Sequence, residues 1–177
     1  MAYRLGDSTA KHSGRLTLNP LAHIDIFWTI ILPLLLYIST SGFFVFGAAK
    51  PVPINYWSLK NPKRDLVWIG IAGPAANFLL ALFLANIIKI LPQSAAWGYL
   101  FKQLIVINVI LGVFNLIPIP PMDGSRILSG MLPDVLAARY AQVERYGLLI
   151  IIALLWLGVF DRIIWPVVFV ILRLLGI

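Results

Sequence analysis

The residues with the clearest chemical potential lie at the end of an apolar segment, in the sequence Asn-Leu-Ile-Pro-Ile-Pro-Pro-Met-Asp-Gly that runs from Asn115 to Gly124. Asp123 supplies a carboxylate, and the prolines before it end a helix and restrict the backbone that carries this side chain. A carboxylate delivered in this way is a candidate metal ligand. The same sequence also fits an ordinary turn or helix cap, because Asp-Gly after proline is common in turns.

Three asparagines lie within apolar segments, where polar side chains need a specific reason. Asn108 and Asn115 are seven residues apart, so both fall near one face of a helix. Asn77 ends the sequence Gly-Pro-Ala-Ala-Asn, which predicts a kink and close packing through small residues. Such asparagines either join neighbouring helices by hydrogen bonds or contact a substrate. The two histidines, His12 and His23, lie in polar or interfacial sequence and are weak candidates for metal ligands.

The composition predicts an integral membrane protein. The chain has 177 residues, of which 60% are hydrophobic and only 12% charged, and its mean hydropathy is +0.92. Soluble domains are about half apolar and one quarter charged. There is no cysteine, so disulfides and thiolate metal sites are excluded. We expect an all-helical polytopic membrane protein in which residues 1–177 form a single domain.

Four apolar stretches must hold these side chains in the membrane. A spanning helix needs about 20 apolar residues, and we expect spans at 66–91, 100–118, 147–160 and 163–176. The last two come from one stretch that Asp161 and Arg162 interrupt, because an unbroken helix would place both charges in lipid. Residues 24–46 either re-enter the membrane, with a break near Pro33 or residues 39–42, or span it once.

The basic residues orient the chain. They lie in residues 1–23, 47–65 and 120–146, whereas residues 92–98 carry none. The positive-inside rule therefore predicts a multi-pass protein of the cell membrane with the three basic segments in the cytoplasm. Two of those segments flank residues 24–46, which favours the re-entrant interpretation. Lipid topology accounts for the net charge of +7, so we expect no nucleic-acid partner.

Residues 52–57 combine strand-forming side chains with two prolines, a composition that confines a strand to a sheet edge. An edge strand there could pair with an extended substrate by strand addition, through Ile54 and Asn55. A surface loop stiffened by its prolines is the alternative. At the start of the chain, the segment from Ala2 to Gly6 looks like the last turn of a helix with its C-terminal glycine.

Taken together, these segments resemble the site-2 protease family of intramembrane zinc metalloproteases, in its compact bacterial branch. The segment from Asn115 to Gly124 matches the N-x-x-P-x-P-x-x-D-G motif of the family, and Gly73-x-x-x-Asn77 matches its second membrane motif. The resemblance extends over nearly the whole chain, including residues 3–25 and 50–55. It implies a site-2-protease-like transmembrane core with a short re-entrant or β-edge segment.

The resemblance also implies a cofactor and a site. Family members bind one zinc ion through two histidines of an H-E-x-x-H helix and the aspartate of the D-G motif, which here is Asp123. If the edge strand containing Ile54 and Asn55 lies next to the metal and pairs with substrate, we expect the amides of Asn77 and Asn115 to hold the substrate's free carbonyls near the zinc. The 177 residues contain no H-E-x-x-H, so none of them is assigned as catalytic. We expect that helix to lie upstream of Met1, with about 30 residues absent through a late start codon or trimming, and we expect this chain alone to be inactive.

Three functional classes remain open. The first is a zinc endopeptidase that hydrolyses peptide bonds in or near transmembrane segments of membrane proteins. The second is a non-catalytic relative that binds membrane segments or a partner protein. The third is a small transporter or channel, which the absence of an internal repeat makes the weakest. An in-frame H-E-x-x-H just upstream of the Met1 codon would favour the first class, and a nearby stop codon the second. The substrate identity and the oligomeric state are not specified by the sequence.

Overall fold

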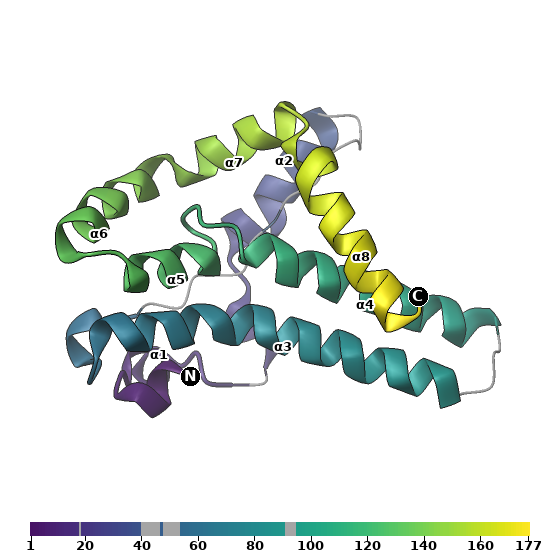
Figure 1. The fold of residues 1–177 in the computed structure, drawn as a ribbon, viewed down its shortest axis with the longest axis horizontal. Helices are drawn as coiled ribbons and strands as arrows, with labels where there is room; N and C mark the ends of the chain where they lie inside the picture. The colour runs from purple at the N-terminus through teal and green to yellow at the C-terminus, as the bar shows by residue number, and fades with distance from the viewer. Residues whose placement is uncertain (18, 40–46, 48–53, 91–94) are drawn as a thin grey trace. The chain divides into compact units, whose positions relative to one another are not determined.

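The computed structural model describes residues 1–17, 19–39, 47, 54–90 and 95–177 (Figure 1). All regular structure in these residues is helical, and they contain no strand, which confirms the predicted all-helical fold. The α-helices are α1 Thr9–His12, α2 Leu32–Ser39, α3 Pro62–Ile90, α4 Ala95–Asn115, α5 Asp123–Met131, α6 Asp134–Ala141, α7 Gly147–Trp156 and α8 Trp165–Leu175. Short 3₁₀ helices cover Ala2–Leu5, Pro20–His23, Tyr56–Ser58 and Gln142–Tyr146, and π-helices cover Ile26–Ile31 and Phe160–Ile164.

The described chain divides into two compact units, Met1–Lys60 and Asn61–Ile177. The first unit is organised by Asp7, whose side chain is completely buried. Its Oδ1 accepts a hydrogen bond from the backbone N–H of Thr9 at 2.9 Å, and its Oδ2 accepts one from the backbone N–H of Asn55 at 2.9 Å. Because these two donors are 46 residues apart in sequence, one carboxylate joins the start of the chain to the segment that precedes α3.

The edge strand expected at residues 52–57 is wrong for the part of it that the structure describes. Val52 and Pro53 lie outside the described residues, and Tyr56–Ser58 form a 3₁₀ helix. The reason is local: the side-chain oxygen of Asn55 accepts a hydrogen bond from the N–H of Trp57 at 3.1 Å and so caps a helical turn. The strand propensity of these residues does not prevail over the cap, because no neighbouring strand in the described residues offers them backbone hydrogen bonds.

We expect Asp7→Asn to loosen the first unit. Burial alone raises the pKa of Asp7, but hydrogen bonds from the Thr9 side chain, the Thr9 N–H and the Asn55 N–H outweigh it and lower that pKa below its usual value. A lowered pKa stabilises the folded state above the unfolded value of about 3.9, and this stabilisation is lost as the pH falls through the folded value. At neutral pH, Asp7→Asn should accelerate amide exchange at Asn55 by about tenfold or more, since charged hydrogen bonds contribute roughly 1.5–3 kcal/mol.

Hydrogen exchange read by mass spectrometry on the peptide that contains Asn55 measures this effect. The control is Asp134→Asn, which alters an exposed carboxylate of the second unit. Unchanged exchange at Asn55 in Asp7→Asn would show that the buried carboxylate does not hold the two segments together.

The second unit is built on two long helices. α3 and α4 lie side by side, and both are long and apolar enough to cross a membrane (Figure 1). α8 packs against α4, and buried side chains of α3, α4 and α8 form one core: Ala81, Leu84 and Ala85 from α3, Ile105, Val109 and Val113 from α4, and Val168 and Leu172 from α8. The predicted spans 66–91 and 100–118 fall largely on α3 and α4, although α4 ends at Asn115, because the chain approaches Pro118.

The C-terminal apolar stretch is bent. The helices over Asp134–Trp156 and Asp161–Leu175 form an angle of 72°, and Gly158 lies between them with a φ of 68°. A positive φ is readily adopted by glycine, which has no Cβ to clash with the backbone. The predicted interruption at Asp161 and Arg162 lies next to this bend. The expected segment 24–46 cannot be assessed as a whole, because residues 40–46 lie outside the described part of the chain.

Candidate functional site

The segment that joins α4 to α5 is a series of tight turns. The N–H of Leu116 donates to the carbonyl of Val113 at 3.1 Å, and the N–H of Met122 donates to the carbonyl of Ile119 at 3.0 Å. The Pro120–Pro121 peptide bond is cis. Since proline restricts φ and supplies no N–H, these residues cannot continue α4. The turns therefore end one candidate span and begin α5 at Asp123.

α5 packs against α3 in the antiparallel direction, and glycines allow the close approach. A Cβ built on Gly70 of α3 would lie 2.7 Å from the backbone oxygen of Asp123. A Cβ built on Gly130, at the other end of α5, would lie 2.5 Å from the backbone oxygen of Lys63. Neither approach leaves room for a side chain, so glycine at both positions sets the distance between the two helices.

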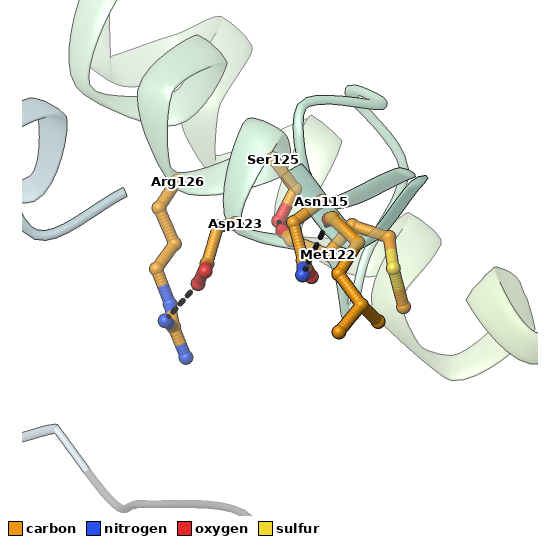
Figure 2. A network of polar contacts seen from close by, with 6 residues as sticks. Asn115, Met122, Asp123, Ser125 and Arg126 are labelled. Atoms are coloured by element: carbon orange, nitrogen blue, oxygen red, sulfur yellow. Dashed lines mark hydrogen bonds and ion pairs between the residues drawn. The ribbon is translucent and has the colours of Figure 1, made fainter. Parts of the chain in front are cut away.

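The Asp123 carboxylate has a defined surrounding on each oxygen. Oδ1 accepts a hydrogen bond from Nη1 of Arg126 at 2.6 Å in an ion pair one turn along α5 (Figure 2). Oδ2 faces α3 at Gly73, where a Cβ would collide with it. The Asp123 side chain is 21% exposed and that of Arg126 30%. Burial raises the pKa of Asp123 above its ordinary value, and the charge and hydrogen bond of Arg126 oppose only part of that rise.

The first turn of α5 is fixed by its own contacts. Ser125 is buried, and its Oγ donates to the carbonyl of Met122 at 2.7 Å (Figure 2). Gly124 is also buried, and a Cβ on it would meet the backbone oxygens of Leu116 and Ile117. The turn after α4 and the start of α5 are therefore packed backbone against backbone, which holds Asp123 in place.

The three predicted asparagines of the long helices differ in how their amides are used. The Nδ2 of Asn115 donates to the carbonyl of Leu111, one turn earlier in α4, at 2.9 Å, and Asn108 does the same to Leu104 at 2.8 Å. Figure 2 shows Asn115 beside the start of α5. Asn77 lies one turn beyond Gly73 on α3, and its side chain has no hydrogen-bond partner among the described residues.

Ile54 and Asn55 belong to the first unit, and their proximity to Asp123 stays a prediction. The backbone N–H of Asn55 already donates to Asp7, and the side-chain oxygen of Asn55 already accepts from Trp57. The backbone N–H of Ile54 has no acceptor within the described residues. Of the two residues, only Ile54 therefore retains a free backbone donor for an extended peptide.

The metal-binding side chains of the described residues do not form a complete zinc site. No group of three His, Cys, Asp or Glu side chains that could hold a metal occurs within the described residues. His12 is engaged locally, with its Nδ1 2.9 Å from the carbonyl of Ser8. Zinc in proteins is usually held by at least three side chains, so Asp123 by itself does not fit the ion. These residues can contribute one carboxylate, already paired with a guanidinium.

Sequence reasoning did not identify two features of this site. Arg126 was not singled out, although its position three residues after Asp123 on a helix is the spacing at which opposite charges pair. Gly73 was assigned only to packing and to a motif, and its contact with Oδ2 of Asp123 depends on how α5 lies on α3. A search for i, i+3 charge pairs could have found the first, whereas the second required the tertiary structure.

Comparisons with known proteins agree with these features. The model of peptidase family M50 matches residues 84–158, which include α4, the turns and α5. YwhC of Bacillus subtilis (strain 168), provisionally named a zinc metalloprotease, is 37% identical over 175 residues that cover 94% of this chain and 76% of YwhC. Rip2 of Mycolicibacterium smegmatis, named in the same way, is 31% identical over 87% of this chain and 58% of Rip2.

A shorter similarity covers part of the chain. The zinc metalloprotease MJ0392 of Methanocaldococcus jannaschii is 40% identical over 73 residues, which are 41% of this chain and 22% of MJ0392. No solved structure gives a significant match. The extent of the similarity to YwhC is decisive, because it includes nearly all of this chain and most of the relative. The chain therefore belongs to peptidase family M50, the site-2 protease family.

Proposed function

We propose that this protein takes part in zinc-dependent hydrolysis of peptide bonds in or near transmembrane segments of other membrane proteins. The observation that carries the proposal is the placement of Asp123. A largely buried carboxylate begins α5, the helix that follows a candidate span, with one oxygen held by Arg126 and the other directed at α3. The relatives named as zinc metalloproteases support zinc as the metal.

Asp123 is the metal ligand that we assign to these 177 residues. The sequence has no H-E-x-x-H, so we assign no other ligand and no general base among them. What this chain does is hold the carboxylate: Arg126 restrains Oδ1, and the glycine at position 73 leaves space for Oδ2. The ion pair with Arg126 limits rotation of the Asp123 side chain, which reduces the conformational entropy that ligand formation would otherwise cost.

The surroundings of Asp123 support a transmembrane segment as the substrate. A transmembrane helix hides its peptide bonds in its own hydrogen bonds, so it must unwind before hydrolysis, and its freed backbone groups then need partners. The Asn77 amide is free of other bonds in the described residues, and Asn115 has a second amide N–H beyond the one given to Leu111. We assign both amides to substrate carbonyls and the N–H of Ile54 to a substrate backbone oxygen.

We place the protein in the cell membrane with its basic segments in the cytoplasm. α3 and α4 are each long and apolar enough to cross, and the basic residues cluster at the N-terminal end of α3 and after α4. In this orientation Asp123, which follows α4, lies towards the cytoplasmic side. The substrate would be a transmembrane protein that reaches the site from the surrounding lipid.

The test compares two forms of the protein against a single-span substrate in proteoliposomes. The first is expressed from its native locus, so that any residues ahead of Met1 are included, and the second is the 177-residue chain. We expect the first to contain about one zinc per molecule and to cleave in a chelator-sensitive manner. We expect the 177-residue chain to retain little zinc and to cleave nothing, because it supplies a single ligand.

A second candidate is a non-catalytic relative that binds membrane segments or a partner protein. The observation in its favour is that no three metal-binding side chains come together in the described residues. If the form expressed from the native locus also lacks zinc and cleavage yet retains the substrate on affinity capture, the non-catalytic function replaces the first proposal. Stoichiometric zinc in the 177-residue chain would instead show that ligands have been missed.

A further inference from the structure

The turn before α3 displays a tryptophan to the outside of its unit. Trp57 is 97% exposed, although the same turn buries Leu59, which is 6% exposed. The exposure of Trp57 is therefore not a sign of a loose segment. A nearly fully exposed indole is unusual in a folded protein, since tryptophan is highly buried on average.

Four contacts hold this turn in place. The Asn55 side chain accepts from the N–H of Trp57, the Asn55 N–H donates to buried Asp7, and the N–H of Lys60 donates to the carbonyl of Leu5 at 3.4 Å. The carbonyl of Ser58 lies against Gly6, whose φ of 110° and close approach exclude a side chain. Trp57 therefore lies on a turn whose backbone is held by contacts within the unit. Its exposure is a feature of the fold and requires a favourable environment for the indole.

The chain itself indicates what that environment is. α3 begins at Pro62, five residues after Trp57, so the two are at most about 18 Å apart along the chain. α3 has 29 residues and is about 44 Å long, longer than the hydrocarbon layer of about 30 Å. Trp68, 45% exposed on α3, is of the residue type that lies at headgroup level. Trp57 is therefore tethered within reach of the membrane surface.

Charge supports the same environment. Lys60, Lys63 and Arg64 are exposed, and they follow Trp57 in the sequence ahead of the apolar part of α3. A basic cluster next to a membrane span is attracted to anionic headgroups. Tryptophan prefers the interface because its ring is apolar and its N–H can donate to headgroup oxygens.

We propose that Trp57 is an interfacial anchor that inserts its indole among phospholipid headgroups in the leaflet at the N-terminal end of α3. The anchor holds the turn that follows Ile54 and Asn55 at a fixed depth. This inference is independent of the proposed peptidase function, because it rests on exposure, chain continuity and charge alone.

The test uses the absence of cysteine from the chain. Ser58→Cys introduces one thiol, which carries a nitroxide, and its depth is measured by power saturation in nanodiscs of mixed neutral and anionic phospholipid. We expect the label to lie at headgroup depth, and Trp57→Ser to raise its accessibility to an aqueous nickel complex by about twofold or more. Tyr3→Ser is the matched control, since Tyr3 is a half-exposed ring of the same unit that already contacts Lys11.

Trp57→Ser should leave the melting temperature of the protein essentially unchanged, because the exposed side chain makes few contacts within the protein. Equal nickel accessibility with and without Trp57 would overturn the anchor. Dipolar broadening between labels that disappears in Trp57→Ser would also overturn it, because Trp57 would then contact a second copy of the chain.

Discussion

Replacing Asp123 by asparagine in the protein expressed from its native locus is expected to reduce peptide cleavage by about 100-fold or more and to lower the zinc content well below one per molecule. Mutation of a residue that only hydrogen-bonds to a metal ligand typically lowers metal affinity or activity by about 10- to 100-fold. Loss of a ligand itself should lower them by at least the upper end of that range. Asparagine preserves the shape of the side chain but removes the negative charge. The measurements are metal analysis of the purified protein and the initial rate against a single-span substrate.

Asp134→Asn is the control for this experiment. Asp134 begins α6 as Asp123 begins α5, and it is paired with Lys63 at 2.8 Å, but its side chain is 89% exposed. An exposed ion pair contributes little to stability, so Asp134→Asn should leave zinc content and cleavage unchanged. Normal zinc and normal cleavage in Asp123→Asn would remove Asp123 from the metal site, and equal losses in both variants would point to a general effect of charge.

Replacing Gly124 by alanine is expected to destabilise the local fold strongly. The added Cβ would meet the backbone oxygens of Leu116 and Ile117, which cannot rotate away as a side chain could. Overpacking of this kind costs about 1–3 kcal/mol and sometimes more. Because Asp123 is the preceding residue, the shift of α5 should also displace its carboxylate. Unfolding in mixed micelles measures the loss of stability.

Gly98→Ala is the matched control, because Gly98 lies in α4 and a Cβ there would meet nothing within 4 Å. Alanine is favoured over glycine in a helix by roughly 1 kcal/mol, so this variant should be as stable as the parent or more stable. The two glycine-to-alanine substitutions are therefore expected to change the stability of the protein in opposite directions. A stable Gly124→Ala variant would show that the turn after α4 is not packed against α5 as described.

Several features of this protein were determined by local sequence. The long apolar runs specify α3 and α4 because a helix satisfies its own backbone hydrogen bonds wherever it lies. Pro118, Pro120 and Pro121 specify the end of α4 and the turn before Asp123, since proline cannot continue a helix. The motif from Asn115 to Gly124 was sufficient to predict the family, which the comparisons confirm.

Other features depended on contacts between residues far apart in the chain. The sequence at 52–57 has strand propensity, but the cap of Asn55 and its bond to Asp7 produce a turn instead, and nothing local indicates that pairing over 48 residues. In the same way, the antiparallel packing of α5 on α3 brings Oδ2 of Asp123 to Gly73. Helix existence is a property of neighbouring residues, whereas the orientation of a carboxylate depends on which distant backbone leaves it room, and only the tertiary structure decides that.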